Sequence, residues 1–74
     1  MQVIRNKHSG YRLTDGNIAT IMRHESEIRT ARTRNRYGLR IDAWQFIFED
    51  GMAIIQRFDR KSCSIDEVGV IRFD

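Results

Sequence analysis

The strongest alternation of apolar and polar positions in this chain surrounds Asp50-Gly51. Residues 39–49 and 52–58 read as two strands, and Asp-Gly is a dipeptide that suits a two-residue type I′ turn. Such a turn places Glu49 opposite Met52 and thereby fixes the register of the hairpin. The predicted pairs are Ile47–Ile54, Gln45–Gln56 and Ala43–Phe58 on one face, and Phe48–Ala53, Phe46–Ile55 and Trp44–Arg57 on the other.

Both faces of this hairpin are apolar. One face carries Trp44, Phe46, Phe48 and Ile55, and the other carries Ile41, Ile47, Met52, Ile54 and Phe58. An antiparallel sheet with one face in water normally alternates cleanly, and a single helix covers only one face. The second face therefore needs a cover, which is the terminal segments, a second copy or a partner protein. For so small a chain we favour a homodimer or a partner surface, and either hairpin face could meet the helix.

A single main helix is predicted between the first strand and the hairpin. Thr14 or Asp15 is a suitable N-cap, and Gly38 is a suitable C-terminal stop. The apolar positions that recur at helical spacing are Ile18, Ile21, Met22 and Ile28.

The ends of the chain complete the predicted fold. Residues 2–5 read as a strand, and residues 11–13 read as a second short strand that returns after a turn. Residues 64–67 have the pattern of a capping box for one helical turn, and residues 68–73 read as a last strand. The fold class is therefore α+β, with residues 1–74 in one domain. One main helix packs on an antiparallel sheet of three to five strands, in the order β(β)αβββ.

The apolar stripe of the predicted helix turns into a row of arginines. Arg29, Arg32 and Arg36 continue the face on which Ile18 lies, and Glu25 can pair with Arg29 one turn later. A protein core does not accept unpaired guanidinium groups. Three arrangements avoid this. The helix can run past the sheet edge into water, it can stop near Ala31, or the arginine stems can lie over aromatic rings at the rim of the core.

The arginine-rich stretch is the strongest functional signal in the sequence. Residues 1–40 have a net charge of +6 and residues 41–74 have −3, which agrees with +3 for the chain. Arginine binds carboxylates and phosphates through two parallel hydrogen bonds. The candidate residues for binding an acidic partner or a nucleic acid are Arg23, Arg29, Arg32, Arg34, Arg36, Tyr37 and Arg40.

Composition and motifs narrow the function classes. A hydrophobic content of 41% and a charged content of 31% are typical of a globular domain, and no apolar run is long enough for a membrane span. The first residues turn polar too early for a signal peptide, and the single cysteine, Cys63, favours a cytoplasmic location. The alternative for Cys63 is an intermolecular disulfide between two copies. Cys63, His8 and His24 are far apart without a zinc-site spacing, so we expect no metal, no cofactor and no enzymatic activity.

Three functions remain after these exclusions. In size and make-up the chain is similar to the small proteins that phages and mobile elements use against host defence, anti-CRISPR proteins among them. That resemblance implies a binding or inhibitor protein that docks on a nucleoprotein or an acidic protein surface and blocks it. Many such inhibitors are acidic mimics of DNA, whereas this chain is basic. The alternatives are a small nucleic-acid-binding regulator, repressor or antitoxin-like, and an accessory subunit that docks on one acidic protein.

Overall fold

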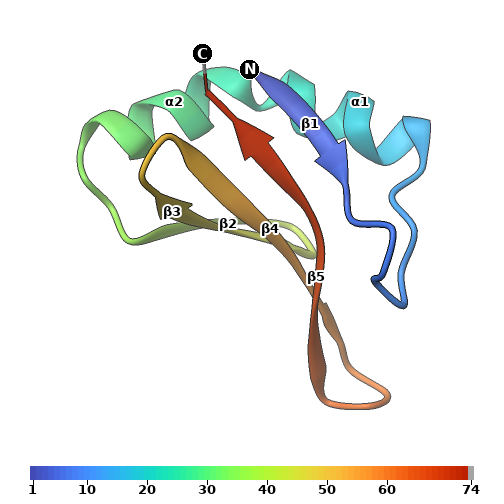
Figure 1. Cartoon of the computed structure of the whole chain (residues 1–74). Helices are drawn as coiled ribbons and strands as arrows, with labels where there is room; N and C mark the ends of the chain where they lie inside the picture. The colour runs from blue at the N-terminus through green and yellow to red at the C-terminus, as the bar shows by residue number, and fades with distance from the viewer. Residues whose placement is uncertain (74) are drawn as a thin grey trace.

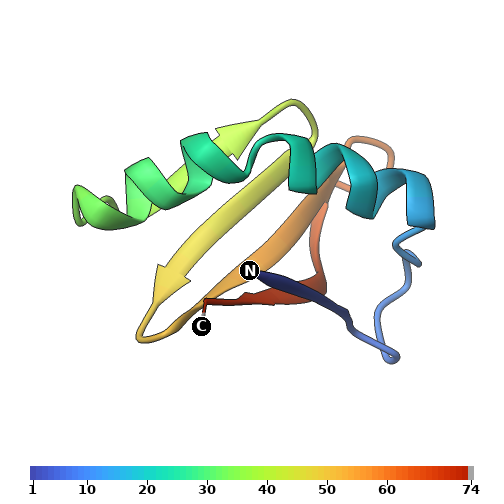
Figure 2. The ribbon, with the colours of Figure 1, turned by 90° about the horizontal axis from the view of Figure 1, so that it is seen from above.

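The hairpin predicted around Asp50 and Gly51 forms the middle of an antiparallel sheet of five strands. The computed structural model describes residues 1–73. Its elements are β1 (Gln2–Arg5), α1 (Asp15–Arg23), α2 (Glu25–Thr33), β2 (Gly38–Ile41), β3 (Trp44–Glu49), β4 (Met52–Asp59) and β5 (Ser64–Arg72). The sheet order is β1-β5-β4-β3-β2, and both helices lie on one face (Figures 1 and 2). The predicted α+β class is therefore confirmed, whereas the element order is corrected to βααββββ.

The predicted register of the central hairpin is confirmed. Glu49 pairs with Met52, and the ladder continues to Trp44 opposite Arg57. Gly51 adopts a positive φ of 73°, which the tight turn requires and which glycine adopts without a steric penalty. The expected pair Ala43–Phe58 does not form, because β3 starts only at Trp44.

The strand predicted over residues 39–49 is broken by a turn at Asp42. Asp42 has a left-handed φ of 53°, a conformation that a short polar side chain tolerates. The chain folds back there, so that β2 pairs with β3 and Ile41 lies opposite Trp44. Directly opposed residues point to the same face of a sheet. Ile41 is therefore buried in the core beside Trp44, and its placement with Ile47 on the second face was wrong.

The one predicted helix is in fact two helices of nine residues each. Thr14 caps α1 through a reciprocal capping box with Asn17, as a threonine N-cap favours. His24 ends α1 and precedes α2, so the helical axis bends between them (Figure 2). The second helix ends at Thr33, and Gly38 is the first residue of β2 rather than the helix stop.

The two ends of the chain pair with each other rather than forming local structures. Strand β1 lies antiparallel to β5, and Tyr11–Leu13 forms no strand. Residues 64–67 belong to β5 and not to a helical turn, because they pair with the long strand β4. A bulge at Val68 shifts the register within β5. Past Arg57, where the pairing with β3 ends, β4 and β5 continue as a two-stranded ribbon that extends past the other strands (Figure 1).

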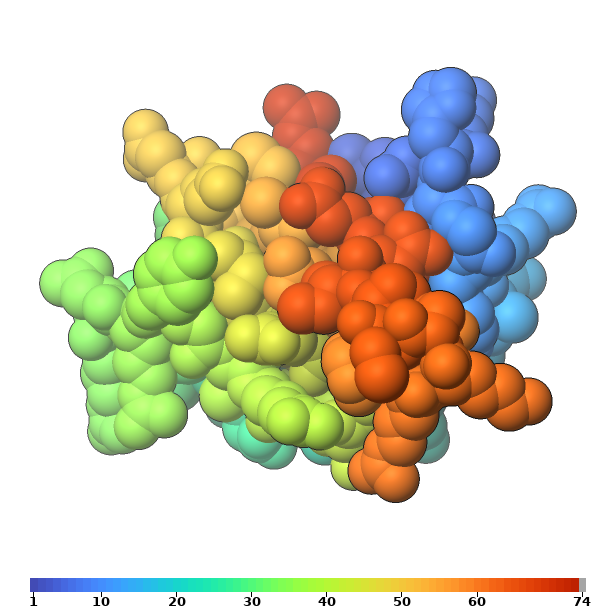
Figure 3. All heavy atoms as spheres, turned by 90° about the horizontal axis from the view of Figure 1, so that it is seen from below, coloured from blue at the N-terminus to red at the C-terminus, as the bar shows by residue number. Residues whose placement is uncertain are grey.

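The hydrophobic core lies between the helices and one face of the sheet, called here the inner face. The hairpin face that meets the helices is the one with Trp44 and Phe46. The most deeply buried large side chains are Leu13, Ile21, Ile28, Phe46, Ile55, Val68 and Ile71. The opposite face, called here the outer face, is not covered by any element of residues 1–73 (Figure 3).

Candidate binding surface

Two of the predicted binding arginines pack on an aromatic ring of the core. The guanidinium carbons of Arg32 and Arg29 lie 4.4 Å and 5.9 Å from the centre of the Phe73 ring. Arg29 also donates a hydrogen bond of 2.7 Å from Nε to the Glu25 carboxylate, which confirms the predicted pair. The arginine row is therefore accommodated by stacking at the rim of the core, where the cation stays in contact with water.

The end of α2 directs the next arginines away from the core. Asn35 has a left-handed φ of 56°, and its amide donates to the Arg32 carbonyl at 3.1 Å. The Arg36 amide donates to the Ala31 carbonyl at 3.2 Å. These two bonds form a Schellman motif, in which asparagine sometimes replaces glycine at the left-handed position. The backbone after α2 is thus fixed by the helix end, and Arg36 lies outside the helix instead of on its face.

Residues 34–37 form a connected segment of exposed side chains, called here the arginine loop. It contains Arg34, Arg36 and Tyr37, and the Tyr37 side chain is 80% exposed. The Tyr37 carbonyl accepts a hydrogen bond of 3.0 Å from the Phe48 amide, which attaches the loop to β3. Within residues 1–73, neither Arg34 nor Arg36 forms an ion pair. The loop therefore presents two unneutralised guanidinium groups beside an exposed aromatic ring.

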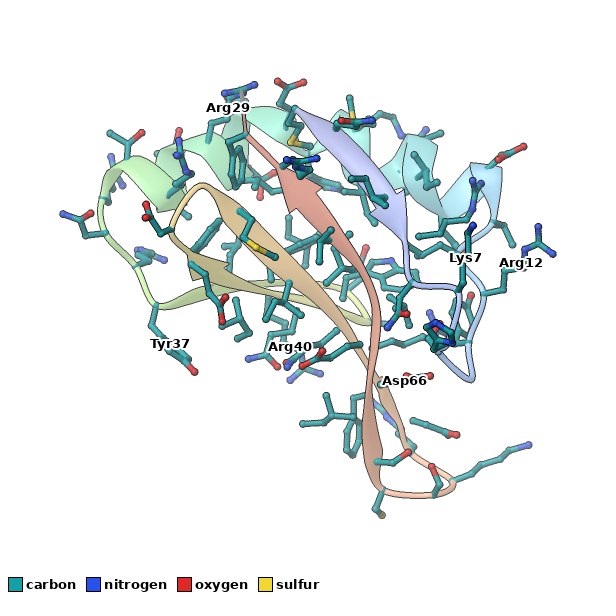
Figure 4. The ribbon with its side chains drawn as sticks, viewed as in Figure 1. Lys7, Arg12, Arg29, Tyr37, Arg40 and Asp66 are labelled. Atoms are coloured by element: carbon teal, nitrogen blue, oxygen red, sulfur yellow. The ribbon has the colours of Figure 1, made fainter. Side chains whose placement is uncertain are left out.

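The remaining predicted binding residues are divided between two places. Arg40 follows the loop on β2, lies opposite Gln45 and extends on the same underside of the molecule as Tyr37 (Figure 4). Arg23 is distant from the loop in the sequence, at the end of α1, where it donates to the Thr20 hydroxyl at 3.0 Å. The structure therefore brings Arg32, Arg36 and Tyr37 together at one depression, next to the exposed Arg34. It places Arg40 further along on β2, holds Arg29 and Arg32 against the Phe73 ring, and leaves Arg23 apart at the end of α1.

Acidic residues lie next to the arginine loop. An open depression of about 650 Å³ separates the loop from the β3–β4 turn. Arg32, Arg36 and Tyr37 line one side of it, and Glu49 and Asp50 line the other. The site thus offers both signs of charge at short range, together with one aromatic ring.

The outer face of the sheet carries a second candidate surface. Its apolar row crosses the sheet through Ile47, Ile54, Val70 and Ile4, which are successive cross-strand partners. On the protruding ribbon, Phe58 and Ile65 are a cross-strand pair with 47% and 59% exposure.

Four of the five residues predicted for this face lie on it: Ile47, Met52, Ile54 and Phe58. Sequence reasoning missed Ile4, Ile65 and Val70. The bulge in β5 interrupts the alternation there, and the pairing of β1 with β5 leaves no local signal.

Two aromatic rings, those of Tyr11 and Trp44, pack around Arg57 at the base of the ribbon. The Arg57 guanidinium carbon lies 4.2 Å from the Tyr11 ring centre and 4.8 Å from the Trp44 ring centre. The predicted cross-strand partners Trp44 and Arg57 thus form a cation–π contact. Asp66, directly opposite Arg57, accepts a hydrogen bond of 2.9 Å from the Tyr11 amide. These contacts attach the loop before α1 to the ribbon.

The nucleophilic and metal-binding residue types are dispersed. Among residues 1–73, no three His, Cys, Asp or Glu side chains are grouped closely enough to hold a metal ion. Cys63 is exposed at the tip of the ribbon, and His24 contacts Glu27 at 3.2 Å on α2. Neither helix in the described part of the chain has the length and apolar character needed to cross a membrane.

Comparison with known proteins gave no assignment: no family model, no curated protein and no solved structure matches this chain.

Proposed function

We propose that this protein is a non-enzymatic binding protein of the inhibitor type, which docks through the arginine loop and Arg40 on an acidic protein or nucleoprotein surface and blocks it. The observation that supports the proposal is the exposure of Arg34 and Arg36, which form no ion pair with any of residues 1–73, beside the exposed ring of Tyr37. Arginine and tyrosine are the residue types that contribute most to binding energy at protein interfaces. An anti-defence role of the anti-CRISPR kind is the biological setting that we propose for such docking.

The backbone of the loop favours specific docking. The Schellman motif at Asn35 and the bond from Phe48 to Tyr37 fix the path of the loop between α2 and β3. A loop that is ordered before binding loses less conformational entropy in the complex. The arginine side chains are therefore presented from a defined backbone, which suits recognition of one particular surface.

The neighbouring carboxylates favour a protein target over bare nucleic acid. Glu49 and Asp50 line the same depression as Arg36 and Tyr37. A phosphate backbone presents only negative charge and would be repelled by these two carboxylates. A protein surface presents both signs of charge, so it can complement the arginines and the carboxylates together.

A charge-reversal pair tests this proposal. The loop variant combines Arg34→Glu with Arg36→Glu. The control variant combines Lys7→Glu with Arg12→Glu and lowers the net charge of the chain by the same amount. Lys7 and Arg12 are exposed and lie at the other end of the molecule (Figure 4). Immobilised wild-type protein and the control should capture the same acidic protein from nuclease-treated extract of the source cell, and the loop variant should not. Equal capture by both variants would refute the role of the loop.

The same experiment separates the nucleic-acid alternative. If capture by the wild type is lost after nuclease treatment, random duplex and single-stranded DNA and RNA are titrated at low and moderate salt. Micromolar affinity that falls steeply with salt would identify phosphate contacts and support a nucleic-acid-binding regulator. Absence of binding at low salt would exclude that alternative.

A further inference from the structure

Two charged residues of opposite sign flank the middle strand β4 at one end of the outer face. Arg72 on β5 and Glu49 on β3 are both cross-strand partners of Met52 on β4. In the row of Gln56, Glu67 on β5 is its direct partner on one side and the uncharged Gln45 on β3 is its partner on the other, while Arg40 lies one strand further away on β2. Each of these four charged side chains is exposed.

Two apolar residues of the outer face flank the same strand. Val70 on β5 and Ile47 on β3 are the two cross-strand partners of Ile54. Phe58 on β4 is 47% exposed, and its partner Ile65 is 59% exposed. A rotation by 180° about β4 therefore exchanges Val70 with Ile47 and basic Arg72 with acidic Glu49, whereas Ile65 has no counterpart on β3, whose pairing with β4 ends at Trp44.

From this pattern we propose that a second copy of this chain covers the outer face, with a two-fold axis along β4. In this dimer Arg72 of each copy lies opposite Glu49 of the other, and Val70 lies opposite Ile47. Ile54 and Phe58 on β4 face the same residues of the second copy. A two-fold interface must be self-complementary, and sheets pack face to face with their strands nearly aligned.

The arrangement of charges distinguishes a second copy from an unrelated partner. An unrelated protein needs no relation between the two halves of the outer face, whereas a two-fold contact requires opposite signs at the positions exchanged by the axis. The inference is drawn from the sheet, and it shares two residues with the proposed docking surface: Glu49 lines the depression beside the arginine loop, and Arg40 belongs to both surfaces. The two helices lie on the other side of the sheet and would stay outside the interface (Figure 1).

Sedimentation equilibrium of the full chain, with light scattering as a second measure of mass, tests the dimer. The wild type should have twice the mass of the 8.8 kDa chain. Glu49→Arg and Arg72→Glu should each weaken dimerisation at least about tenfold, because like charges then face each other. The variant that combines both changes should recover the wild-type dissociation constant, since every charge pair is restored in the opposite order.

A second pair of variants checks the apolar contact and the fold. Ile54→Asp should give a monomer, because two carboxylates would meet on the axis. Met22→Asp is the matched control on α1, where Met22 is 37% exposed, and it should remain dimeric. Circular dichroism establishes that each variant is folded. A wild type that is monomeric at about 1 mM would overturn this arrangement. So would a folded double variant, Glu49→Arg with Arg72→Glu, that dimerises as weakly as the single variants.

Discussion

The guanidinium carbon of Arg32 lies 4.4 Å from the centre of the Phe73 ring, so that α2 and the C-terminal end of β5 are joined by a cation–π contact. Phe73 also packs beside Phe48, with ring centres 6.4 Å apart. This contact explains why the helical stripe changes from isoleucine to arginine at this point. The apolar stem of Arg32 covers the edge of the core while its charged end stays exposed.

Arg32 and Arg34 should therefore differ in their effect on stability. We expect Arg32→Ala to lower the free energy of unfolding by about 0.5–1 kcal/mol, the value of an exposed cation–π contact. Arg34→Ala should change it by less than about 0.5 kcal/mol, as is usual for a surface position without partners. Urea unfolding followed by circular dichroism measures both. Equal effects would mean that the Phe73 contact does not stabilise the fold.

Arg57 should be the most stabilising arginine of the ribbon. Its guanidinium contacts both Tyr11 and Trp44. We therefore expect Arg57→Ala to lower the free energy of unfolding by about 1–2 kcal/mol. Arg60→Ala, at the exposed ribbon tip, is the control and should be nearly neutral. Since Trp44 is the single tryptophan, its fluorescence reports unfolding and the local change together. An unchanged emission spectrum in Arg57→Ala would contradict the contact.

Replacement by alanine should lower the free energy of unfolding at Gly69 and raise it at Gly16. A Cβ at Gly69 would lie 2.5 Å from the Ile4 carbonyl oxygen and 3.0 Å from Leu13 Cδ1, so β1 could not stay paired as it is. We expect Gly69→Ala to destabilise by about 1–3 kcal/mol. At Gly16 the nearest atom lies at 3.7 Å, and Gly16→Ala should stabilise α1 by up to about 1 kcal/mol. Thermal unfolding of both variants gives the comparison.

Tyr37 should contribute to binding and not to stability. Because its side chain is 80% exposed, Tyr37→Ala should leave the free energy of unfolding within about 0.5 kcal/mol of the wild type. Its affinity for the captured acidic protein should fall at least about tenfold, as for an aromatic residue at the centre of an interface. Tyr37→Phe keeps the ring and should retain most of the affinity, which calorimetric titration can measure. Unaltered affinity in Tyr37→Ala would place the interface elsewhere.

The parts of the fold that could be predicted from the sequence are those specified by neighbouring residues. The Asp50-Gly51 turn fixed the register from Trp44 to Arg57, and Thr14 marked the start of the first helix. The turn at Asp42 was missed because Asp42-Ala43 lacks the glycine that marks a two-residue hairpin turn, and Ile41 was consequently assigned to the outer face. At the candidate site, the sequence identified the arginine-rich stretch but treated Arg29, Arg32 and Arg36 as one row.

The amino-acid order by itself determined the α+β class, the central hairpin, the apolar character of both its faces and the concentration of positive charge before β2. The tertiary structure alone decided which arginines remain available for a partner. Phe73 is distant from α2 in the sequence, yet its ring lies beneath Arg29 and Arg32, while Asn35 turns Arg36 and Tyr37 outward. The pairing of β1 with β5 joins the two ends of the chain, and the Phe73 ring packs against residues from the middle of the chain. Such long-range contacts leave no periodic signal in the local sequence.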